Sequence, residues 1–413
     1  DDAERFHPPQ VHLSHEWQVS PNWTLDQTVF WIKGEGYFDF GAAFRSADFL
    51  RLPDDFALGG ERLSESERQL PLFSVGDVSP DDVILRGTLD QNQVGWIPTV
   101  VYEDGTTETT LGLETRLHRS LRWGRIQEAG PQIPDDVVGP DANHRLWQFR
   151  GEKIITAAFA SHRFRPRDRL AVQGELQLTW RRYRFYEEKT FDRPDRQSHA
   201  FSVPYLFANP RLGVTLNPDQ PVSAYASLAW AHREPRLTQL YEGQEGPAGA
   251  QPQFEQNANG TFDYDEPLVE AEQLVDLELG GTLERSRYRL SANLFWMEFW
   301  DEIVPSGAVN QFGKPRTGNA DRTRHVGLEV EGAAQLLPGW TVSGNAMLAR
   351  TRFVDFTEYR TLGDTTVALS RDGNPIASSP EALANLRTSY TWRGLTASAH
   401  VQAVGRQYVD NSE

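Results

Sequence analysis

The sequence lacks several features that mark common protein classes. It has no cysteine, which excludes disulfide bonds, cysteine-ligated zinc and thiol catalysis. No stretch approaches the ~18–20 apolar residues that a membrane-spanning helix needs, and the mean hydropathy is -0.55. A basic excess is also absent, because 41 Lys and Arg face 58 Asp and Glu and the net charge is -17 at pH 7. We therefore expect no nucleic-acid partner.

Signals for export or anchoring are absent as well. The 413 residues contain no signal peptide and no lipidation motif. The sequence begins at Asp1 in the middle of a strand-like pattern. We therefore expect a fragment of a longer chain and not a cytoplasmic protein.

What the sequence does contain is alternation of apolar and polar residues with a period of two, which indicates β-strands with two unlike faces. In Thr110–Leu121, leucines alternate with Gly, Glu, Arg, His and Ser. The segments Arg169–Trp180 and His325–Leu336 show the same pattern. A soluble β-sandwich and an outer-membrane barrel both produce such strands, so the alternation alone leaves the two open.

The connections between the strands favour the barrel. Seven short turns are predicted near Pro21-Asn22, Asp104-Gly105, Pro166-Arg167, Pro218-Asp219, Glu284-Arg285, Pro338-Gly339 and Arg393-Gly394. They alternate with long connections predicted at 40–88, 123–149, 187–201, 233–270, 303–322 and 354–379. This segregation is typical of an outer-membrane barrel, with short periplasmic turns and long extracellular loops. We predict an all-β, antiparallel up-and-down barrel portion of about fourteen strands, in one domain covering residues 1–413.

Aromatic residues agree with this prediction. Aromatics make up 11% of the chain, with twelve Trp. A first group lies beside the short turns on the apolar parity: Trp23, Tyr288, Trp340, Tyr390 and Trp392. A second group lies nearer the long connections: Trp17, Trp31, Trp230 and Trp296. Two such rows are typical of the aromatic belts at the two surfaces of a membrane, although Trp also favours strands in general.

Candidate chemical sites are few. His12 and His15 are three apart, which places them on opposite faces of a strand. His118 shares a face with Glu114 and Arg116, but a polar ladder between strands explains this better than a ligand site. Glu329 and Glu331 share a face at about 7 Å, a spacing known from glycosidases and also routine in a barrel wall.

Two charged stretches leave alternatives open. Arg181-Arg182-Tyr183-Arg184 ends a strand on the loop side, where it could attract an anionic ligand or a lipopolysaccharide phosphate, or be charge at a strand end. Asp263–Glu266 could bind a divalent cation, although a solvated acidic loop explains it better. No phosphate-binding loop or nucleophile elbow occurs. We predict no catalytic residue, no metal ligand and no cofactor, and the ligand-binding residues stay unknown.

Several segments resemble the barrel of TonB-dependent outer-membrane receptors. The run Ala229–Tyr241 resembles the strand end and loop entry of that family, with Arg-Glu-Pro followed by a Leu-Tyr pair. Further similar segments are Leu268–Glu272, which lacks the usual proline, Leu277–Gly280, Asn319–Gly332, Asn374-Pro375 with Pro380, Gly405–Tyr408, and Trp17 with the Pro21-Asn22 turn and Gly34–Tyr37. Their order and spacing cover nearly the whole chain.

The resemblance implies a gated importer of a scarce nutrient in the outer membrane of a Gram-negative bacterium. Family barrels have twenty-two strands, so the fourteen here would be about the seventh to the twentieth, with the plug, the first strands and the last two missing. The implied partners are TonB, through the missing N-terminal part, a small-molecule ligand at the extracellular loops, and outer-membrane lipid and lipopolysaccharide. A ferric siderophore or related iron chelate is the expected substrate, and no enzyme activity is expected.

Rival functions remain at this point. The alternatives are an importer of cobalamin or glycan, a passive porin, a soluble extracellular β-protein, and an outer-membrane enzyme barrel. The last is disfavoured because no nucleophile motif is found.

Overall fold

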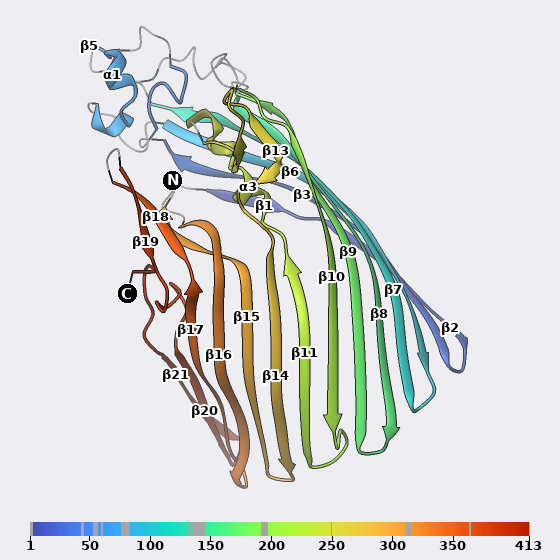
Figure 1. Cartoon of the computed structure of the whole chain (residues 1–413). Helices are drawn as coiled ribbons and strands as arrows, with labels where there is room; N and C mark the ends of the chain where they lie inside the picture. Colours follow the sequence, from blue (N-terminus) through green and yellow to red (C-terminus); the bar gives the residue numbers. More distant parts are fainter. Residues whose placement is uncertain are drawn as a thin grey trace.

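The computed structural model describes residues 3–42, 45–52, 57–58, 61–75, 83–130, 133, 145–190, 197–248, 250–309, 315–362 and 365–412. Most of them belong to one curved antiparallel sheet of 15 strands, in which nearly every strand pairs with its neighbours along the chain (Figure 1). The strands are β1 (Glu4–His7), β2 (Gln10–Ser20), β3 (Trp23–Gly41), β6 (Val83–Glu103), β7 (Thr107–Ala129), β8 (Arg145–Arg167), β9 (Leu170–Lys189), β10 (Phe201–Leu216), β11 (Val222–Arg233), β14 (Glu272–Arg285), β15 (Tyr288–Val309), β16 (Pro315–Leu337), β17 (Trp340–Asp355), β20 (Ala382–Trp392) and β21 (Leu395–Val404).

The short elements all belong to the long connections, at the upper end of the sheet in Figure 1. They are the hairpins β4 (Ala57–Leu58) with β5 (Glu61–Arg62), β12 (Phe254–Gln256) with β13 (Phe262–Pro267), and β18 (Thr357–Leu362) with β19 (Thr365–Ser370), the helices α1 (Glu65–Arg68) and α3 (Leu237–Leu240), and the 3₁₀ helices η1 (Leu72–Ser74) and η2 (Gly243–Ala248). No helix among the described residues is long and apolar enough to cross a membrane.

All seven predicted hairpins are present, with their turns together at the lower end in Figure 1. At two of them, near Pro166-Arg167 and Glu284-Arg285, the strands continue about two residues beyond the predicted turn. Several turns place glycine at positive φ, as at Gly105 with φ 85°, where a side chain would be strained. The predicted fourteen strands are confirmed.

The fifteenth strand, β1, is separated from β2 by Pro8-Pro9. Both strands pair with β3, in register one after the other. Because proline has no backbone N–H to donate, two prolines in succession interrupt the ladder, and one long edge strand becomes two.

The predicted connection at 303–322 is wrong, because β15 and β16 continue through most of it. Here Val304 and Ala320 are buried against Phe353, Phe356 and Ile376. Strands that are packed by neighbouring loops no longer need one apolar and one polar face, so the alternation fades although the ladder continues. The strands β3, β6, β7 and β8 also extend into the predicted connections 40–88 and 123–149.

The two faces of the sheet differ as the alternation predicts. On one face, here called the apolar face, large hydrophobic side chains such as Leu111, Leu113 and Leu178 are about half exposed, at 51%, 53% and 49%. The nine aromatic residues of the two predicted rows are all exposed as well. A water-soluble sheet would cover such a face, whereas a lipid-facing wall leaves it bare of protein.

On the opposite, polar face, aromatic rings lie over glycines of the neighbouring strand. Gly112 is the register partner of Phe159, and a Cβ added to Gly112 would come within 2.1 Å of the ring. Gly95 with Phe30 and Gly327 with Phe295 repeat the arrangement. Glycine is needed at these positions because the ring occupies the space of its missing side chain.

Candidate functional site

The long connections pack together above the loop end of the sheet and form a hydrophobic cluster, here called the loop-end core. Its members come from the connections and from the upper ends of β6–β10: Ala42, Ala47, Phe49, Leu50, Leu52, Leu72, Val83, Leu85, Ile126, Ile133, Leu146, Trp147, Phe149, Phe185, Phe201, Val203, Leu240, Tyr241 and Phe254. Phe185 lies at its centre, with ring centroids 4.9 Å from Phe149, 5.3 Å from Phe201 and 5.1 Å from Tyr241. The core gives the connections a defined position above the strands.

An ion pair joins two connections that are distant in sequence. Both terminal nitrogens of Arg45 donate to the carboxylate of Glu245 at 3.1 Å, and both side chains are almost fully buried. The Arg45 guanidinium also lies over the Phe49 ring at 4.4 Å. A bidentate pair of this kind fixes geometry as well as adding energy, so the β3–β6 and β11–β14 connections are held together.

A second buried polar group lies beside Phe185. The Tyr241 hydroxyl donates to one carboxylate oxygen of Glu188 at 2.6 Å, and the backbone N–H of His199 donates to the other at 2.6 Å. The His199 ring forms a hydrogen bond with the Tyr264 hydroxyl at 2.8 Å. Burial raises the pKa of Glu188 and lowers the pKa of His199, because burial disfavours the charged form of each.

Beneath this core, the polar face of β6–β9 and the β11–β14 connection enclose a cavity of about 390 Å³. The lining includes Gln93, Arg116, His118, Ser120, Arg122, Phe149, Glu152, Lys153, Tyr183, Leu237, Tyr241 and Glu242. Three of these residues are cationic, Arg116, Arg122 and Lys153. The carboxylates of Glu152 and Glu242 offset two of these charges, so the cavity combines aromatic surface with a small excess of positive charge. Such a lining suits an anionic, partly apolar ligand.

Arg122 has the fewest polar partners of these three cations. Arg116 pairs with Glu114, and Lys153 donates to Tyr183 and Glu234, at 2.8 Å each. Among the residues that the structure describes, Arg122 makes no hydrogen bond or ion pair, although Glu242 is close enough to act on it through charge. A partly buried guanidinium without a partner has its donors available to a bound anion.

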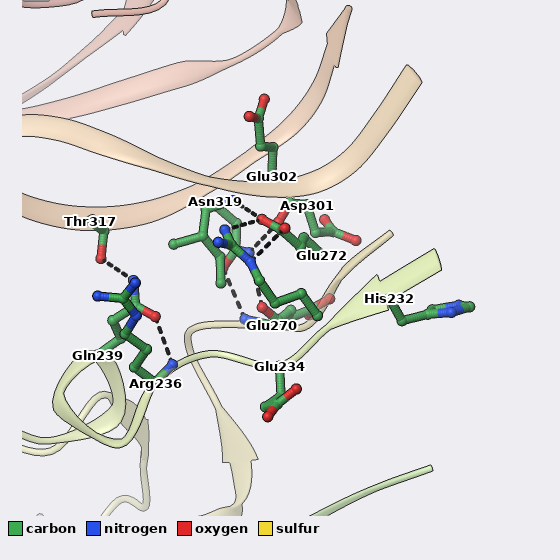
Figure 2. Close-up of polar contacts among 12 residues, drawn as sticks. His232, Glu234, Arg236, Gln239, Glu270, Glu272, Asp301, Glu302, Thr317 and Asn319 are labelled. Atoms are coloured by element: carbon green, nitrogen blue, oxygen red, sulfur yellow. Dashed lines mark hydrogen bonds and ion pairs between the residues drawn. The ribbon is translucent and has the colours of Figure 1, made fainter. Parts of the chain in front are cut away.

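The connection that closes the cavity is fastened to the sheet by the segments that resemble the receptor family (Figure 2). The Asn319 side chain bonds both the N–H and the carbonyl of Glu270, at 2.9 and 3.1 Å, and also donates to the Asp301 carbonyl at 2.6 Å. Gln239 donates to Thr317 at 2.9 Å. These side chains hold the two ends of the β11–β14 connection, so their role is to position Leu237 and Tyr241 over the cavity.

The residues singled out in the sequence are distributed as follows. His118 and Arg116 line the cavity, and Glu114 joins Arg116 along the same strand, so their predicted shared face is confirmed. Glu329 and Glu331 also share a face, in a second hollow lined by Asn293 and Asn345.

His12 and His15 are separated, as predicted. His12 stacks on Phe30, whereas His15 hydrogen-bonds Gln27 at 3.2 Å.

The Arg181–Arg184 stretch divides between the two faces. Arg181 turns to the polar face and binds Glu234, while Arg182 binds Glu152 at 3.2 Å on the apolar face. Asp263 caps the Asp265 N–H at 3.1 Å, and in the part of the chain that the structure describes no group of three or more His, Asp or Glu is arranged to hold a metal ion.

Sequence reasoning missed Arg122, Tyr241 and the Arg45–Glu245 pair as parts of the site. Arg122 continues the polar parity of His118 and Ser120, so the alternation contained a signal for its direction. Nothing in the sequence relates Arg45 to Glu245, because a long connection has no periodicity from which its path could be inferred.

Comparisons with known proteins give one family. A search of curated proteins finds no match to the sequence. Among solved structures, the ferric yersiniabactin uptake receptor FyuA from Yersinia pestis is similar with a TM-score of 0.63 and 14% identity over 99% of this chain and 51% of the receptor. The copper transporter OprC gives 0.65 and 14% over 97% and 52%, and the ferric citrate transporter FecA in the unliganded form gives 0.64 and 13% over 100% and 50%.

These likenesses concern the fold, and this chain spans about half the length of each of those proteins. The family described as TonB dependent receptor-like, beta-barrel, matches residues 3–413. The chain therefore belongs to the TonB-dependent receptor family and represents its β-barrel.

Proposed function

We propose that this chain is part of the wall of an outer-membrane receptor that imports an anionic ferric chelate. Receptors of this family are outer-membrane barrels that work with TonB and bind small molecules, and they are not enzymes. Family membership argues against the passive porin, the soluble β-protein and the enzyme barrel. The ferric chelate is favoured over cobalamin or glycan by the charge of the cavity.

The observation that carries the substrate class is Arg122 in the cavity beneath the loop-end core. Ferric siderophores and ferric citrate present carboxylate, hydroxamate or catecholate oxygens around the metal, and the complexes are commonly anionic. Arg122 offers donors to such oxygens, and Tyr183 and Tyr241 add aromatic surface to the lining. The volume of about 390 Å³ accommodates part of a ligand of this size.

The domain organisation is also a proposal. Residues 1–413 form a single barrel portion, and a plug from sequence outside this chain fills the lumen. Two observations support this: β21 pairs only with β20 among the described strands, and related chains are about twice as long. In lipid, an open sheet edge leaves backbone groups unpaired, so additional strands are needed to close the wall.

Iron uptake by the full-length receptor tests the proposal. In a deletion strain under iron limitation, we expect restored growth and uptake of radiolabelled iron from at least one probe among ferric citrate, a ferric hydroxamate and a ferric catecholate. In Arg122→Gln, the apparent affinity for that chelate should fall roughly 10- to 100-fold, the loss expected for a hydrogen bond to a charged group.

The matched control is Arg387→Gln, which removes an arginine from a different hollow on β20 and should leave uptake unchanged. Rescue by cobalamin or a glycan with no response to any ferric chelate would refute the substrate class. Normal iron uptake by Arg122→Gln would show that the chelate does not bind through Arg122 in this cavity, although the chain could still belong to an iron receptor.

A further inference from the structure

Two Arg–Glu–Arg networks lie on the apolar face. Glu152, the carboxylate of the first network, also borders the cavity. In the first, Arg119 and Arg182 donate to opposite oxygens of Glu152, at 2.8 and 3.2 Å. In the second, Arg322 and Arg324 both donate to Glu298, with Arg324 bound through two nitrogens at 2.7 and 3.1 Å. We call these networks the β7–β9 triad and the β15–β16 triad. Each has one carboxylate and two guanidiniums, so each carries one net positive charge.

The alternation of the strands places both triads on the lipid side. Arg119 alternates with His118 and Ser120, which line the cavity on the polar face. Arg182 continues the line of Leu176 and Leu178, which are exposed on the apolar face.

The second triad has the same orientation. Glu298 lies between Trp296 and Trp300, and Arg324 precedes Val326 and Leu328. All four of these hydrophobic side chains are exposed, and the Trp296 ring nitrogen donates to Glu298 at 3.1 Å. Both triads therefore extend the apolar face.

The two triads also lie at a similar height. Their residues are 10 to 15 positions from the turn-side ends of their strands. At about 3.3 Å per residue and a strand tilt of about 40° this is roughly 25–38 Å above the turns. Roughly 25–30 Å is the height of the apolar band of a bilayer. The triads therefore lie at the upper border of that band, at the level of the headgroups of the outer leaflet.

In each triad the arginine side chains are more exposed than the carboxylate, so the arginines are the part that a ligand could reach. The carboxylates of Glu152 and Glu298 are 5% and 9% exposed, whereas Arg119 and Arg182 are 63% and 35% exposed, and Arg322 and Arg324 are 42% and 39% exposed. Each buried carboxylate thus holds two guanidiniums that are themselves partly exposed. Arginine is well suited to such a position because its planar donors match phosphate oxygens.

Aromatic rings below the guanidiniums support the same geometry. The Arg182 guanidinium is 5.7 Å from the centroid of the Trp180 ring, and Arg324 is 5.2 Å from that of Trp296. Neighbouring Arg184 lies over Tyr186 at 4.6 Å. Cation–π contacts hold the cations at the aromatic border, which keeps them out of the apolar band itself.

We propose that the two triads bind phosphate groups of lipopolysaccharide in the outer leaflet. Among the residues that the structure describes, no second carboxylate forms an ion pair with either triad. The anionic group available at the border of the lipid is the phosphate of a lipid headgroup. The inference rests on the outer-membrane location proposed above, and it is independent of the imported substrate. Loss of lipopolysaccharide binding with normal iron uptake, or the reverse, separates the two proposals.

Lipopolysaccharide binding by the full-length receptor in detergent tests the proposal. We expect the wild type to bind purified lipid A carrying its phosphates, and Arg119→Gln/Arg182→Gln to bind it roughly tenfold or more weakly, since each cation near a charged membrane surface contributes about fivefold. Arg322→Gln/Arg324→Gln should behave likewise. Dephosphorylated lipid A should bind wild type and variants equally weakly.

Two controls separate binding from folding. Arg289→Gln/Arg387→Gln removes the same charge from strands β15 and β20 away from both triads and should bind lipid A as the wild type does. Glu152→Gln leaves both guanidiniums in place and removes a negative charge, so its lipid A binding should equal or exceed that of the wild type. All variants should retain the wild-type heat-modifiable gel shift.

Three results would overturn the proposal. The first is equal lipid A binding by the arginine variants and the wild type. The second is an equal loss for Glu152→Gln and the arginine pair, which would show a purely structural network. The third is full displacement of lipid A by millimolar inorganic phosphate, which would show a general anion site and not a lipid headgroup site.

Discussion

On the turn side of the sheet, Leu111 and Leu178 are about half exposed, whereas at the loop end Phe185 has no exposed surface. The same strands, β7 to β9, pass through both regions. On the turn side, backbone ladders and rings lying over glycines hold the strands, and the hydrophobic side chains point away from the protein. At the loop end the hydrophobic side chains point toward one another. A single strand is thus stabilised mainly by backbone pairing on the turn side and by hydrophobic packing at the loop end.

Replacing the centre of the loop-end core should give the largest effect. Phe185→Ala removes a fully buried ring that contacts Phe149, Phe201 and Tyr241, and we expect a loss of about 3–5 kcal/mol in the stability of the connections. Limited proteolysis of the receptor in detergent measures it, as faster cleavage within the long connections.

The matched change on the turn side is Leu178→Ala. Lipid or detergent fills the space that this substitution leaves, so only the transfer term is lost, about 1–2 kcal/mol, and cleavage of the connections should not change. Equal protease sensitivity of the Phe185→Ala and Leu178→Ala variants would contradict the proposed difference in packing between the loop end and the turn side.

A change on the turn side that acts through the polar face should give an intermediate effect. Gly112→Ala places a Cβ within 2.1 Å of the Phe159 ring, and displacing the ring should cost about 1–3 kcal/mol. The temperature at which the folded band disappears from a heat-modifiable gel measures it. Gly174→Ala is the control, since the space around Gly174 is open to 4 Å. A lower midpoint for Gly174→Ala than for Gly112→Ala would contradict the role of the ring.

The pH response of the loop end should be the smallest effect. The pKa of His199 is lowered by burial, so its contribution to stability is present above its ordinary value of 6.5 and is lost as the pH falls through the folded pKa. The pKa of Glu188 is raised by burial, so its contribution has the opposite sign: it is present below 4.5 and is lost as the pH rises through the folded pKa.

Between pH 4.5 and 6.5 the two contributions oppose each other. Glu188→Gln removes one of them, so protease sensitivity of its connections should rise as the pH falls from 7 to 5, more than in the wild type. His199→Gln should show the reverse, with connections that become more resistant over the same range. A pH-independent Glu188→Gln would show that His199 does not titrate there.

Most of the turn side could be predicted from the sequence. In a wall that is one sheet thick, successive residues face opposite surroundings, so the alternation of apolar and polar residues records which face each side chain is on. Leu111 and Leu113 on one face and Arg116 and His118 on the other were placed correctly on this basis. The loop end could not be predicted in the same way. Val304 and Ala320 lie on strand segments that pack against Phe353, Phe356 and Ile376, and the alternation of residues fades there.

The candidate site was predictable only in part. The direction of Arg122 follows from the parity of β7, but the cavity also needs Leu237 and Tyr241, which reach it through a long connection. Their position depends on Asn319 and Gln239, whose partners lie far along the chain. Such contacts are decided by packing in three dimensions and leave no local pattern.

The ion pair between Arg45 and Glu245 has a consequence for the order of folding, because its two residues are 200 positions apart. Each hairpin of the sheet can form from residues that follow one another closely, and closing such a short loop is fast. We expect the pair to form after the strands β6 to β11 that lie between its partners, since contacts of high sequence separation are made late and slowly. The surface that would meet a ligand is thus assembled last, after the wall beneath it is already in place.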